Sequence, residues 1–436
     1  MRGIVLAILA LFICNVSVAD EMRLIPFKEA EKTALKNSPQ LIAQQYIADS
    51  GYQQASSEKM KRFPSLQLGA QSSLTSKLGK INIPTLGLSN TVGEHLNWNI
   101  SPTLNFIVWD TGRILNKAKS LRKAADAQTD TLDYDKRQVL LNARTTYVGV
   151  QIAKEQVRLV KDALALAKSQ YAVVLDRFKT GTSDKFDLTV ADQEVAERIK
   201  DLEQAGGELL VSKRALVAAL AIEDKIEKAE TMDVEPIKTS LDILTPRSNT
   251  AFDPKTHPQV KALENQKSSS ELAEKSIVAR YFPEITLQGS AGYEYPNLGA
   301  DDVIQQNRAS LGLQMPIFEW GSIWKDAKSQ KYLAKSADQQ KRQTVIDLTR
   351  DVSETRDWIE TFKRLQLANV RAVKDAVEVA KLSFDSYKAG RIIFLDVQRA
   401  NVKELSAKVD AARNDGNLAA QIAKLLALAE DVALSE

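Results

Sequence analysis

The sequence predicts a mainly α-helical, internally duplicated protein with long coiled-coil helices and four β-strands arranged as two hairpins. Three observations predict this class. Motifs of the first half of the chain return in the second half, two stretches of more than sixty residues contain no proline, and each half holds one pair of alternating segments. Repeats at a fixed offset indicate duplication, long uninterrupted stretches indicate coiled-coil helices, and period-two patterns indicate β-hairpins.

The duplication keeps two offsets. Motifs before the alternating segments return after 219 residues, and motifs beyond them return after 209. The first half therefore carries ten extra residues between Pro64 and Gly112, which indicates a longer loop at a hairpin tip. The matching pairs are Asn37-Ser38-Pro39-Gln40-Leu41 with Thr256-His257-Pro258-Gln259-Val260, Phe63-Pro64 with Phe282-Pro283, Trp109-Asp110-Thr111-Gly112 with Phe318-Glu319-Trp320-Gly321, and Phe178-Lys179-Thr180-Gly181 with Tyr387-Lys388-Ala389-Gly390.

Each half has the same predicted order of elements: a helix, a hairpin, a long helix and a further helix. The first repeat covers 20–221, with a hairpin over 64–109, a long helix over 113–179 and a helix over 182–221. A connector over 222–253 leads to the second repeat, 254–425, with a hairpin over 283–318, a long helix over 320–389 and a helix over 392–425. Residues 1–19 are predicted as a signal peptide and 426–436 as a C-terminal tail.

The long helix is the most informative element. The stretch 113–179 would span about 100 Å at about 1.5 Å per residue. It carries apolar residues at heptad spacing, which indicates packing along a coiled-coil seam. The residues seven apart are Ala143, Val150, Val157, Leu164, Tyr171 and Phe178.

The four predicted strands cannot close a membrane barrel alone, because the smallest such barrels have about eight strands. An open sheet edge in hydrocarbon would leave backbone groups unpaired, at a cost of several kcal/mol each. If the hairpins enter a membrane, several chains must therefore share one barrel; two chains give eight strands and three give twelve. Aromatic residues near the strand ends suit an interfacial girdle, although the same residues could pack a soluble sandwich core. The girdle candidates are Trp98, Trp109, Tyr293 and Trp320.

The N-terminus indicates export. Arg2 precedes an apolar run, and Ser17-Val18-Ala19 is a small-residue cleavage site, so we expect the mature chain to start at Asp20. The only cysteine, Cys14, would leave with this segment. No later stretch is apolar for long enough to predict a transmembrane helix. The near balance of 59 basic and 56 acidic residues argues against a nucleic-acid-binding protein.

The order and spacing of these motifs resemble the TolC-like outer membrane factors, over residues 27–425. The opening motifs around Pro39 and Pro258, the strand-to-helix junction Met315-Pro316-Ile317-Phe318-Glu319-Trp320-Gly321 and the turns at Gly181 and Gly390 carry the resemblance. It implies a homotrimer in which each subunit adds four strands to one shared twelve-stranded membrane β-barrel in the outer membrane. It also implies that the long coiled-coil helices build an α-helical barrel, a tunnel through the periplasm. It further implies docking of a periplasmic adaptor protein and an inner-membrane pump, for efflux or type I secretion of small molecules or polypeptides.

The resemblance also assigns candidate site residues. It implies that Gly181 and Gly390 are the turn residues of the periplasmic tips and that Asp187 and Asp396 start the returning helices. These aspartates could cap helices or could contact the adaptor. Gly112, Pro316 and Gly321 would form the strand–helix junctions. Candidates for a tunnel constriction, which could equally belong to a solvated helix face, are Asp375, Glu378, Asp385 and Arg391.

Two other classes of protein compete with a channel. Catalysis has little support, because the two histidines, His95 and His257, lack metal-ligand spacing and no phosphate-binding or nucleophile motif is present. We therefore expect neither an enzyme nor a cofactor. The remaining alternative is a soluble periplasmic or surface coiled-coil scaffold.

Overall fold

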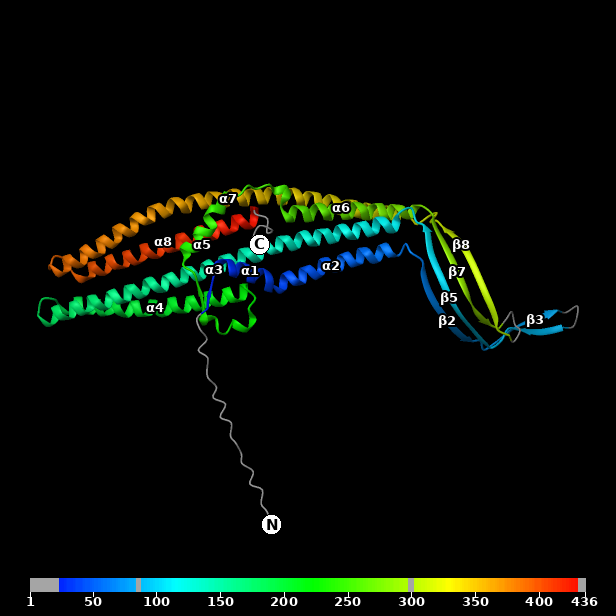
Figure 1. Ribbon diagram of the computed structural model, residues 1–436, viewed down its shortest axis with the longest axis horizontal. Coiled ribbons are helices and arrows are strands. Elements are labelled where there is room, and N and C mark those ends of the chain that lie inside the picture. The colour runs from blue at the N-terminus through cyan, green and yellow to red at the C-terminus, as the bar shows by residue number, and fades with distance from the viewer. Residues whose placement is uncertain (1–22, 84–87, 297–301, 430–436) are drawn as a thin grey trace, which may run out of the picture. The chain divides into compact units, whose positions relative to one another are not determined.

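The computed structural model describes residues 23–83, 88–296 and 302–429. The chain divides into two compact units (Figure 1). One, which we call the tip unit, comprises residues 1–39, 137–252 and 352–436; the other, the sheet unit, comprises 40–136 and 253–351. Each unit takes segments from both sequence repeats. The predicted signal peptide and the last residues of the predicted C-terminal tail lie outside the described residues.

The helices repeat with the two offsets of the sequence. Helix α2 (Pro39–Met60) corresponds to α6 (Pro258–Val278), and α4 (Lys185–Ala219) to α8 (Phe394–Ala429). The two longest helices, α3 (Arg113–Lys179) and α7 (Ser322–Lys388), both have 67 residues and begin 209 residues apart. The predicted mainly helical, duplicated fold class is thereby confirmed.

Helix α1 (Phe27–Asn37) is separate from α2, although the sequence predicts a single helix before the first hairpin. Ser38 is extended, with φ −61° and ψ 112°. A residue before proline disfavours the helical conformation, and Pro39 lacks the N–H that a continuous helix would need. The chain therefore breaks at Ser38 and starts again at Pro39.

In the sheet unit, α2 lies against the first part of α3, α3 against α6, and α6 against the first part of α7. Polar contacts mark each boundary. The Tyr52 hydroxyl donates to Asp126 at 3.0 Å, and Lys267 pairs with Asp338 at 3.1 Å. Between α3 and α6, Ser120 and Ser269 each donate a hydroxyl to the other's backbone carbonyl. These paired serines allow the two helices to approach closely.

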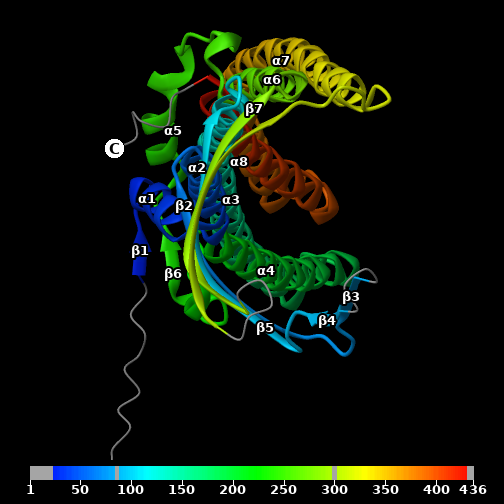
Figure 2. The same ribbon diagram turned by 90° about the vertical axis from the view of Figure 1, so that its right-hand side faces the viewer.

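The long strands form one antiparallel sheet in the order β2-β5-β7-β8. The strands are β2 (Ser65–Leu74), β5 (Leu96–Trp109), β7 (Glu284–Tyr295) and β8 (Ile304–Gln314). The two hairpins thus join through β5 and β7, and β2 and β8 are the edges. In Figures 1 and 2 the four strands run side by side as one curved layer that extends beyond the helix ends of the unit.

The structure adds two strand pairs that the sequence did not predict. Strands β3 (Gly79–Ile83) and β4 (Leu88–Val92) pair with each other in the long loop of the first hairpin, the loop that holds the ten extra residues. Strand β1 (Arg23–Ile25) pairs in parallel with β6 (Met232–Val234) of the connector, which also contains α5 (Ile237–Leu244). The first pair lengthens the hairpin, and the second fastens the N-terminal segment to the connector.

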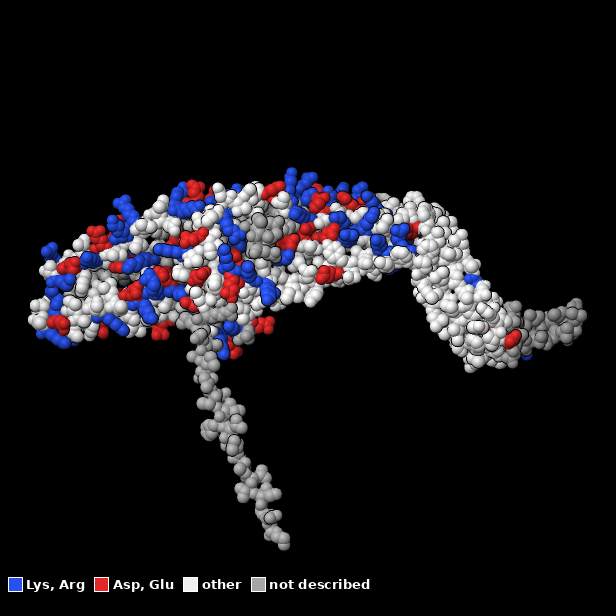
Figure 3. All heavy atoms as spheres, viewed as in Figure 1, with Lys and Arg blue, Asp and Glu red and all other residues white. Residues whose placement is uncertain are grey.

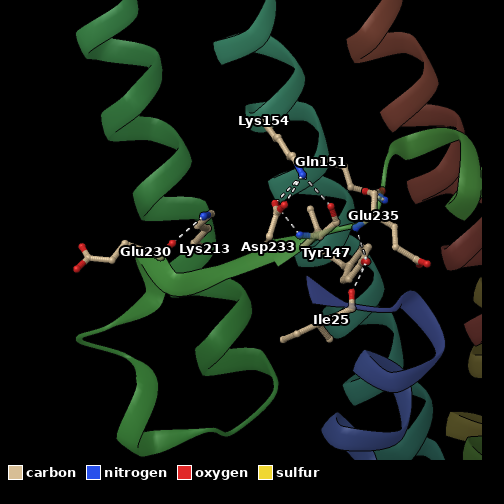
Figure 4. A network of polar contacts seen from close by, with 9 residues as sticks. Ile25, Tyr147, Gln151, Lys154, Lys213, Glu230, Asp233 and Glu235 are labelled. Atoms are coloured by element: carbon tan, nitrogen blue, oxygen red, sulfur yellow. Dashed lines mark hydrogen bonds and ion pairs between the residues drawn. The ribbon is translucent and has the colours of Figure 1, made fainter. Parts of the chain in front are cut away.

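The core of the tip unit lies where α3 meets this connector (Figure 4). Tyr147 is fully buried; its hydroxyl donates to the Ile25 carbonyl at 2.7 Å and accepts from the Glu235 N–H. Lys154 pairs with Asp233 on β6 at 2.6 Å. Because buried polar groups are costly unless they are paired, this network fixes β1 and β6 against α3.

Elsewhere in the tip unit, α8 approaches α3 very closely. A Cβ atom on Gly416 would lie 2.1 Å from the Ile152 side chain, so a larger residue at this position would force that side chain to move. The predicted heptad seam of α3 is buried over most of its length. Val150 and Val174 are fully buried, whereas Phe178 at the helix end is 38% exposed. The seam therefore packs along the second half of α3 and becomes exposed at the helix C-terminus.

Candidate functional site: a two-faced sheet and the helix tips

The sheet of the sheet unit has one apolar and one polar face. Its strand register places apolar residues of neighbouring strands opposite one another, such as Leu66 with Leu104 and Leu287 with Leu311. Most of these side chains are exposed, and Leu68 and Leu311 reach 74% and 72%. A continuous exposed apolar face of this size marks contact with lipid or with another protein.

The opposite face of the same strands is polar. Gln67 lies opposite Thr103, Gln71 opposite Asn99, and Thr103 opposite Ser290. Gln288 donates to Asn105 at 3.0 Å, and Arg308 forms an ion pair with Glu294. This alternation of an apolar and a polar face is the pattern of a membrane β-barrel whose interior holds water.

Charged side chains confirm the contrast between sheet and helices. Figure 3 shows Lys, Arg, Asp and Glu spread over the helices, whereas the visible surface of the long strands is nearly free of them. The sheet surface is thus suited to a medium in which charge is costly.

The girdle candidates lie near opposite ends of the sheet. Near the hairpin loops, Trp98 stacks on Tyr295 at 6.0 Å, and Tyr293 is 54% exposed. At the helix end lie Trp109 and Trp320, the latter packed edge-on against Phe318 at 4.7 Å. Trp109 lies eleven positions after Trp98 along β5, or about 37 Å at about 3.4 Å per residue. With a strand tilt of about 35–45°, their height difference is about 26–30 Å, close to the apolar band of an outer-membrane barrel, about 25 Å.

The strand–helix junctions have the same backbone in both repeats. Thr111 and Gly112 have φ of 56° and 80°, and their counterparts Trp320 and Gly321 have φ of 49° and 78°. Two left-handed residues in succession turn the chain sharply from strand to helix. In the first repeat, Asp110 accepts from the N–H groups of Gly112 and Ile114 and so caps α3. Pro316, the other junction candidate, lies just past the end of β8.

Gly181 and Gly390 lie at the turns of the tip unit, with φ of 73° and 70°. Glycine is favoured there because other residues pay a steric cost at positive φ. The residue that caps α4 is Asp184, whose side chain accepts from the Asp187 N–H at 2.8 Å. Sequence reasoning missed Asp184, although its place just before the helix, three residues ahead of Asp187, is typical of an N-cap.

Asp187 is 9% exposed, and its carboxylate reaches the other repeat. It accepts from the Phe394 N–H at 3.1 Å, at the start of α8, and from the Ser183 hydroxyl at 3.2 Å. It thereby supplies negative charge to the N-terminus of α8. Its counterpart Asp396 lacks such burial: its side chain is 45% exposed and lies 3.4 Å from Arg399.

Further residues that the sequence did not indicate join the two turns. Arg177 donates to the Lys388 carbonyl at 2.6 Å, and its guanidinium lies over the Tyr387 ring. The Tyr387 hydroxyl lies 3.1 Å from Ser183, and burial raises its pKa. These contacts depend on how the two helix pairs pack, which no local pattern reveals.

The constriction candidates lie on the exposed surface near the end of α7. Asp375 is 3.6 Å from Arg371, and Asp385 is 2.7 Å from Lys388. The hydrogen bond from Lys388 lowers the pKa of Asp385, so this carboxylate is ionised at neutral pH. Glu378, one helical turn before Lys381, and Arg391, just after the turn, are exposed as well.

Equivalent surfaces of the two repeats differ in exposure. Within the chain, β5 of the first repeat pairs with β7 of the second, and both hold many half-buried residues. The counterparts of these strands, β8 and β2, are exposed almost throughout. At the tips, Tyr387 is 3% exposed, whereas its counterpart Phe178 is 38% exposed. The surface where the first repeat contacts the second is therefore buried within the chain. We call this contact a repeat junction; the equivalent surfaces on the outer sides of the two repeats are exposed, and we call them open repeat junctions.

The fold and these surfaces define a channel-type protein with duplicated helical hairpins and a membrane-compatible sheet. A family model described as outer membrane efflux protein matches residues 31–221 and 256–429. The chain belongs to this family, which consists of outer-membrane channel proteins that extend into the periplasm and not of enzymes or soluble scaffolds. No curated protein sequence gives a match.

Solved structures share the fold. The structure of CusC aligns with a TM-score of 0.76 and 16% identity over 92% of both chains. The CmeC outer membrane channel of Campylobacter jejuni aligns at 0.77 and 16% over 92% of this chain and 85% of that one. VceC of Vibrio cholerae aligns at 0.77 and 14%, over 92% and 95%. Among the described residues, no helix has an apolar stretch long enough to cross a membrane.

Proposed function

We propose that three copies of this chain form one twelve-stranded barrel in the outer membrane, continued by a helical tunnel through the periplasm. The observation that carries this proposal is the pair of open repeat junctions, one along the sheet edges and one at the tips. Within the chain, the end of the first repeat contacts the start of the second repeat. The end of the second repeat is exposed, and the start of the first repeat in a second copy has the matching surface. Repetition of one such contact around an axis closes a ring.

The two faces of the sheet then have defined roles. The apolar face contacts lipid, and the polar face, with Gln67, Gln71 and Asn99, lines a water-filled bore. Ring closure pairs every strand edge, which hydrocarbon requires because it cannot hydrogen-bond free backbone groups. The protein would thus conduct solutes across the outer membrane without catalysis.

The tips are the proposed docking region for a periplasmic adaptor protein that links the channel to an inner-membrane pump. Gly181 and Gly390 form the turns there. Asp396 is the better candidate for partner contact, because Asp187 is buried and already holds α8. This arrangement supports export in a tripartite complex, with cargo selected elsewhere.

Reconstitution of the mature protein into planar lipid bilayers tests the proposal. We expect discrete, long-lived conductance steps, and we expect the protein to stay with outer membranes after a high-salt wash. A folded preparation that gives no steps and is released by salt would contradict it, and would favour a scaffold.

The acids at the end of α7 are proposed to narrow the bore. Replacement of Asp375 and Asp385 together by Ala should raise single-channel conductance and lower cation preference, because two carboxylates per subunit leave the constriction. Glu360→Ala, at an exposed position on the same helix, is the matched control and should change neither property. Unchanged conductance and selectivity in the double variant would exclude these acids as the constriction.

A further inference from the structure

Strands β2 and β8 are the two edges of the sheet, where a second copy of the chain could pair. The sheet direction permits this pairing: alternate strands of the order β2-β5-β7-β8 are antiparallel, so β8 of one copy meets β2 of the next as an antiparallel partner. The inference rests on the proposed ring. It specifies which residues of β8 and β2 pair at the boundary between two subunits.

The duplication supplies the template. The contact between β5 and β7 joins the second strand of the first repeat to the first strand of the second repeat. The contact between β8 and the next copy's β2 would join the second strand of the second repeat to the first strand of the first repeat. Both contacts therefore bring together the same two kinds of strand, in the same order around the ring.

The offsets convert one register into the other. Leu104 pairs with Gly289, and Asn105 pairs with Gln288. Adding 209 to each β5 number gives Leu313 and Gln314 on β8. Subtracting 219 from each β7 number gives Ala70 and Gly69 on β2. We infer that β8 pairs with β2 of the neighbouring subunit in the register Leu313 to Ala70 and Gln314 to Gly69.

The sheet faces agree with this register. Leu313 lies opposite Ile285 within its own chain, and Ala70 lies opposite Ile100, so both belong to the apolar face. Gln314 lies opposite Glu284, on the polar face. A slip by one residue would place an apolar side chain of one subunit beside a polar one of the next and would break both faces.

The exposed segment after β8 also fits. Ile317 and Trp320 are 96% and 89% exposed, and Met315 and Phe318 are exposed as well. In the same register, Met315 comes opposite Leu68, as Phe106 lies opposite Leu287 within the chain. In β5 the register shifts by one residue between Ile107 and Trp109, which places Trp109 opposite Ile285; the same shift in an extended β8 would place Phe318 opposite Leu66. β5 continues to Trp109 beside its neighbour β7, whereas β8 ends at Gln314, the counterpart of Asn105. Pairing with the next copy therefore extends β8 toward its helix.

One local difference is expected. Gly292 approaches β5 so closely that a Cβ atom would lie 2.4 Å from the Ile100 carbonyl, next to Pro102, which has no N–H to donate. The counterparts at the subunit boundary are Ser73 and Leu311. The close approach of Gly292 is a local distortion of the β5–β7 pairing. The β5–β7 register is the same before and after it, as the pairs Ile100–Tyr293 and Thr103–Ser290 show. The ladder between subunits should be regular there.

Disulfide formation between introduced cysteines tests the register, because Cys14 is the only native cysteine and lies in the predicted signal peptide. Directly opposite residues have Cβ atoms about 4.5–5.5 Å apart and diagonal neighbours about 7–8 Å, whereas a disulfide needs about 3.5–4.5 Å. Two double variants place one pair on each face, so that both kinds of antiparallel pair are sampled. They are A70C with L313C, and G69C with Q314C.

Slipped partners serve as matched controls. For L313C these are L68C and S72C, and for Q314C they are Q67C and Q71C. Mature protein in outer membranes is oxidised with copper phenanthroline and resolved on a non-reducing gel. We expect covalent trimer to form about ten-fold faster or more in at least one inferred pair than in its slipped controls, because the slipped Cβ atoms are too far apart.

The outcomes separate two failures. Faster cross-linking of a slipped pair would overturn the register while the ring stands. A stable oligomer with no interchain disulfide in any pair would overturn β8–β2 contact itself. A monomer under reducing, non-denaturing conditions, for wild type as well as variants, would overturn the proposed ring, and the register with it.

Discussion

Gly390 and Gly206 are both exposed glycines, but their backbones differ. Gly390 ends α7 with φ 70°, whereas Gly206 lies inside α4 with open space around it. Gly390→Ala should lower the free energy of unfolding by about 1–2 kcal/mol, because alanine is strained at positive φ. Gly206→Ala should raise it by about 0.5–1 kcal/mol, because alanine favours the helix. Thermal unfolding followed by circular dichroism at 222 nm measures both; equal signs would contradict the assigned turn.

Asp187 gives a second test at the residue scale. Asp187→Ala removes the acceptor of the Phe394 N–H and should cost about 1.5–3 kcal/mol of local stability, as expected for a charged hydrogen-bond partner. Amide hydrogen exchange in the first turn of α8 should accelerate accordingly. Asp396→Ala, which removes the half-exposed counterpart, should leave that turn unchanged. If both variants accelerate exchange equally, the distinction between the two aspartates is wrong.

At the scale of elements, the sequence predicts most of the helices and the long strands. The lack of proline across 113–179 predicts one long helix, and α3 occupies that range. Alternation of Leu66, Leu68 and Ala70 with polar residues predicts a strand, and these residues lie on the apolar face of β2. Both patterns are local, because a helix or strand face is set by residues a few positions apart.

Other parts of the structure depend on distant contacts that local patterns do not encode. The parallel pairing of Arg23–Ile25 with the connector joins segments about two hundred residues apart. The contact of Ser183 with Tyr387 requires the two helix pairs to pack side by side. The β3–β4 pair arises in the long loop of the first hairpin, ten residues of which have no counterpart in the second repeat. The candidate turns were visible in the sequence, but their polar partners were not.

The two-faced sheet gives a prediction at the same scale. Leu104 and Thr103 are adjacent on β5 and belong to opposite faces. Leu104→Arg should cost about 2–4 kcal/mol if the apolar face meets the middle of the bilayer, and should sharply reduce the protein recovered from outer membranes. Thr103→Arg, its matched control, points into the proposed bore and should insert normally. Equal recovery of both variants would show that the apolar face does not contact lipid.

At the scale of the whole molecule, each copy of the chain supplies the surfaces that its neighbours leave open. Within one chain the first repeat contacts the second, and the outer side of each repeat stays exposed. Among the described residues, the four-stranded sheet has two unpaired edges. At the tips, Phe178 is 38% exposed, whereas its counterpart Tyr387 is 3% exposed. Membrane insertion of a single chain would expose free strand edges to hydrocarbon, whereas a ring of subunits exposes none.

Native mass spectrometry of the mature protein, extracted from outer membranes in mild detergent, tests this directly. We predict one dominant species with three times the mass of the mature subunit, stable until the detergent denatures the sheet. A dominant species with the mass of one subunit would contradict the account, because no single four-stranded sheet can close a bore.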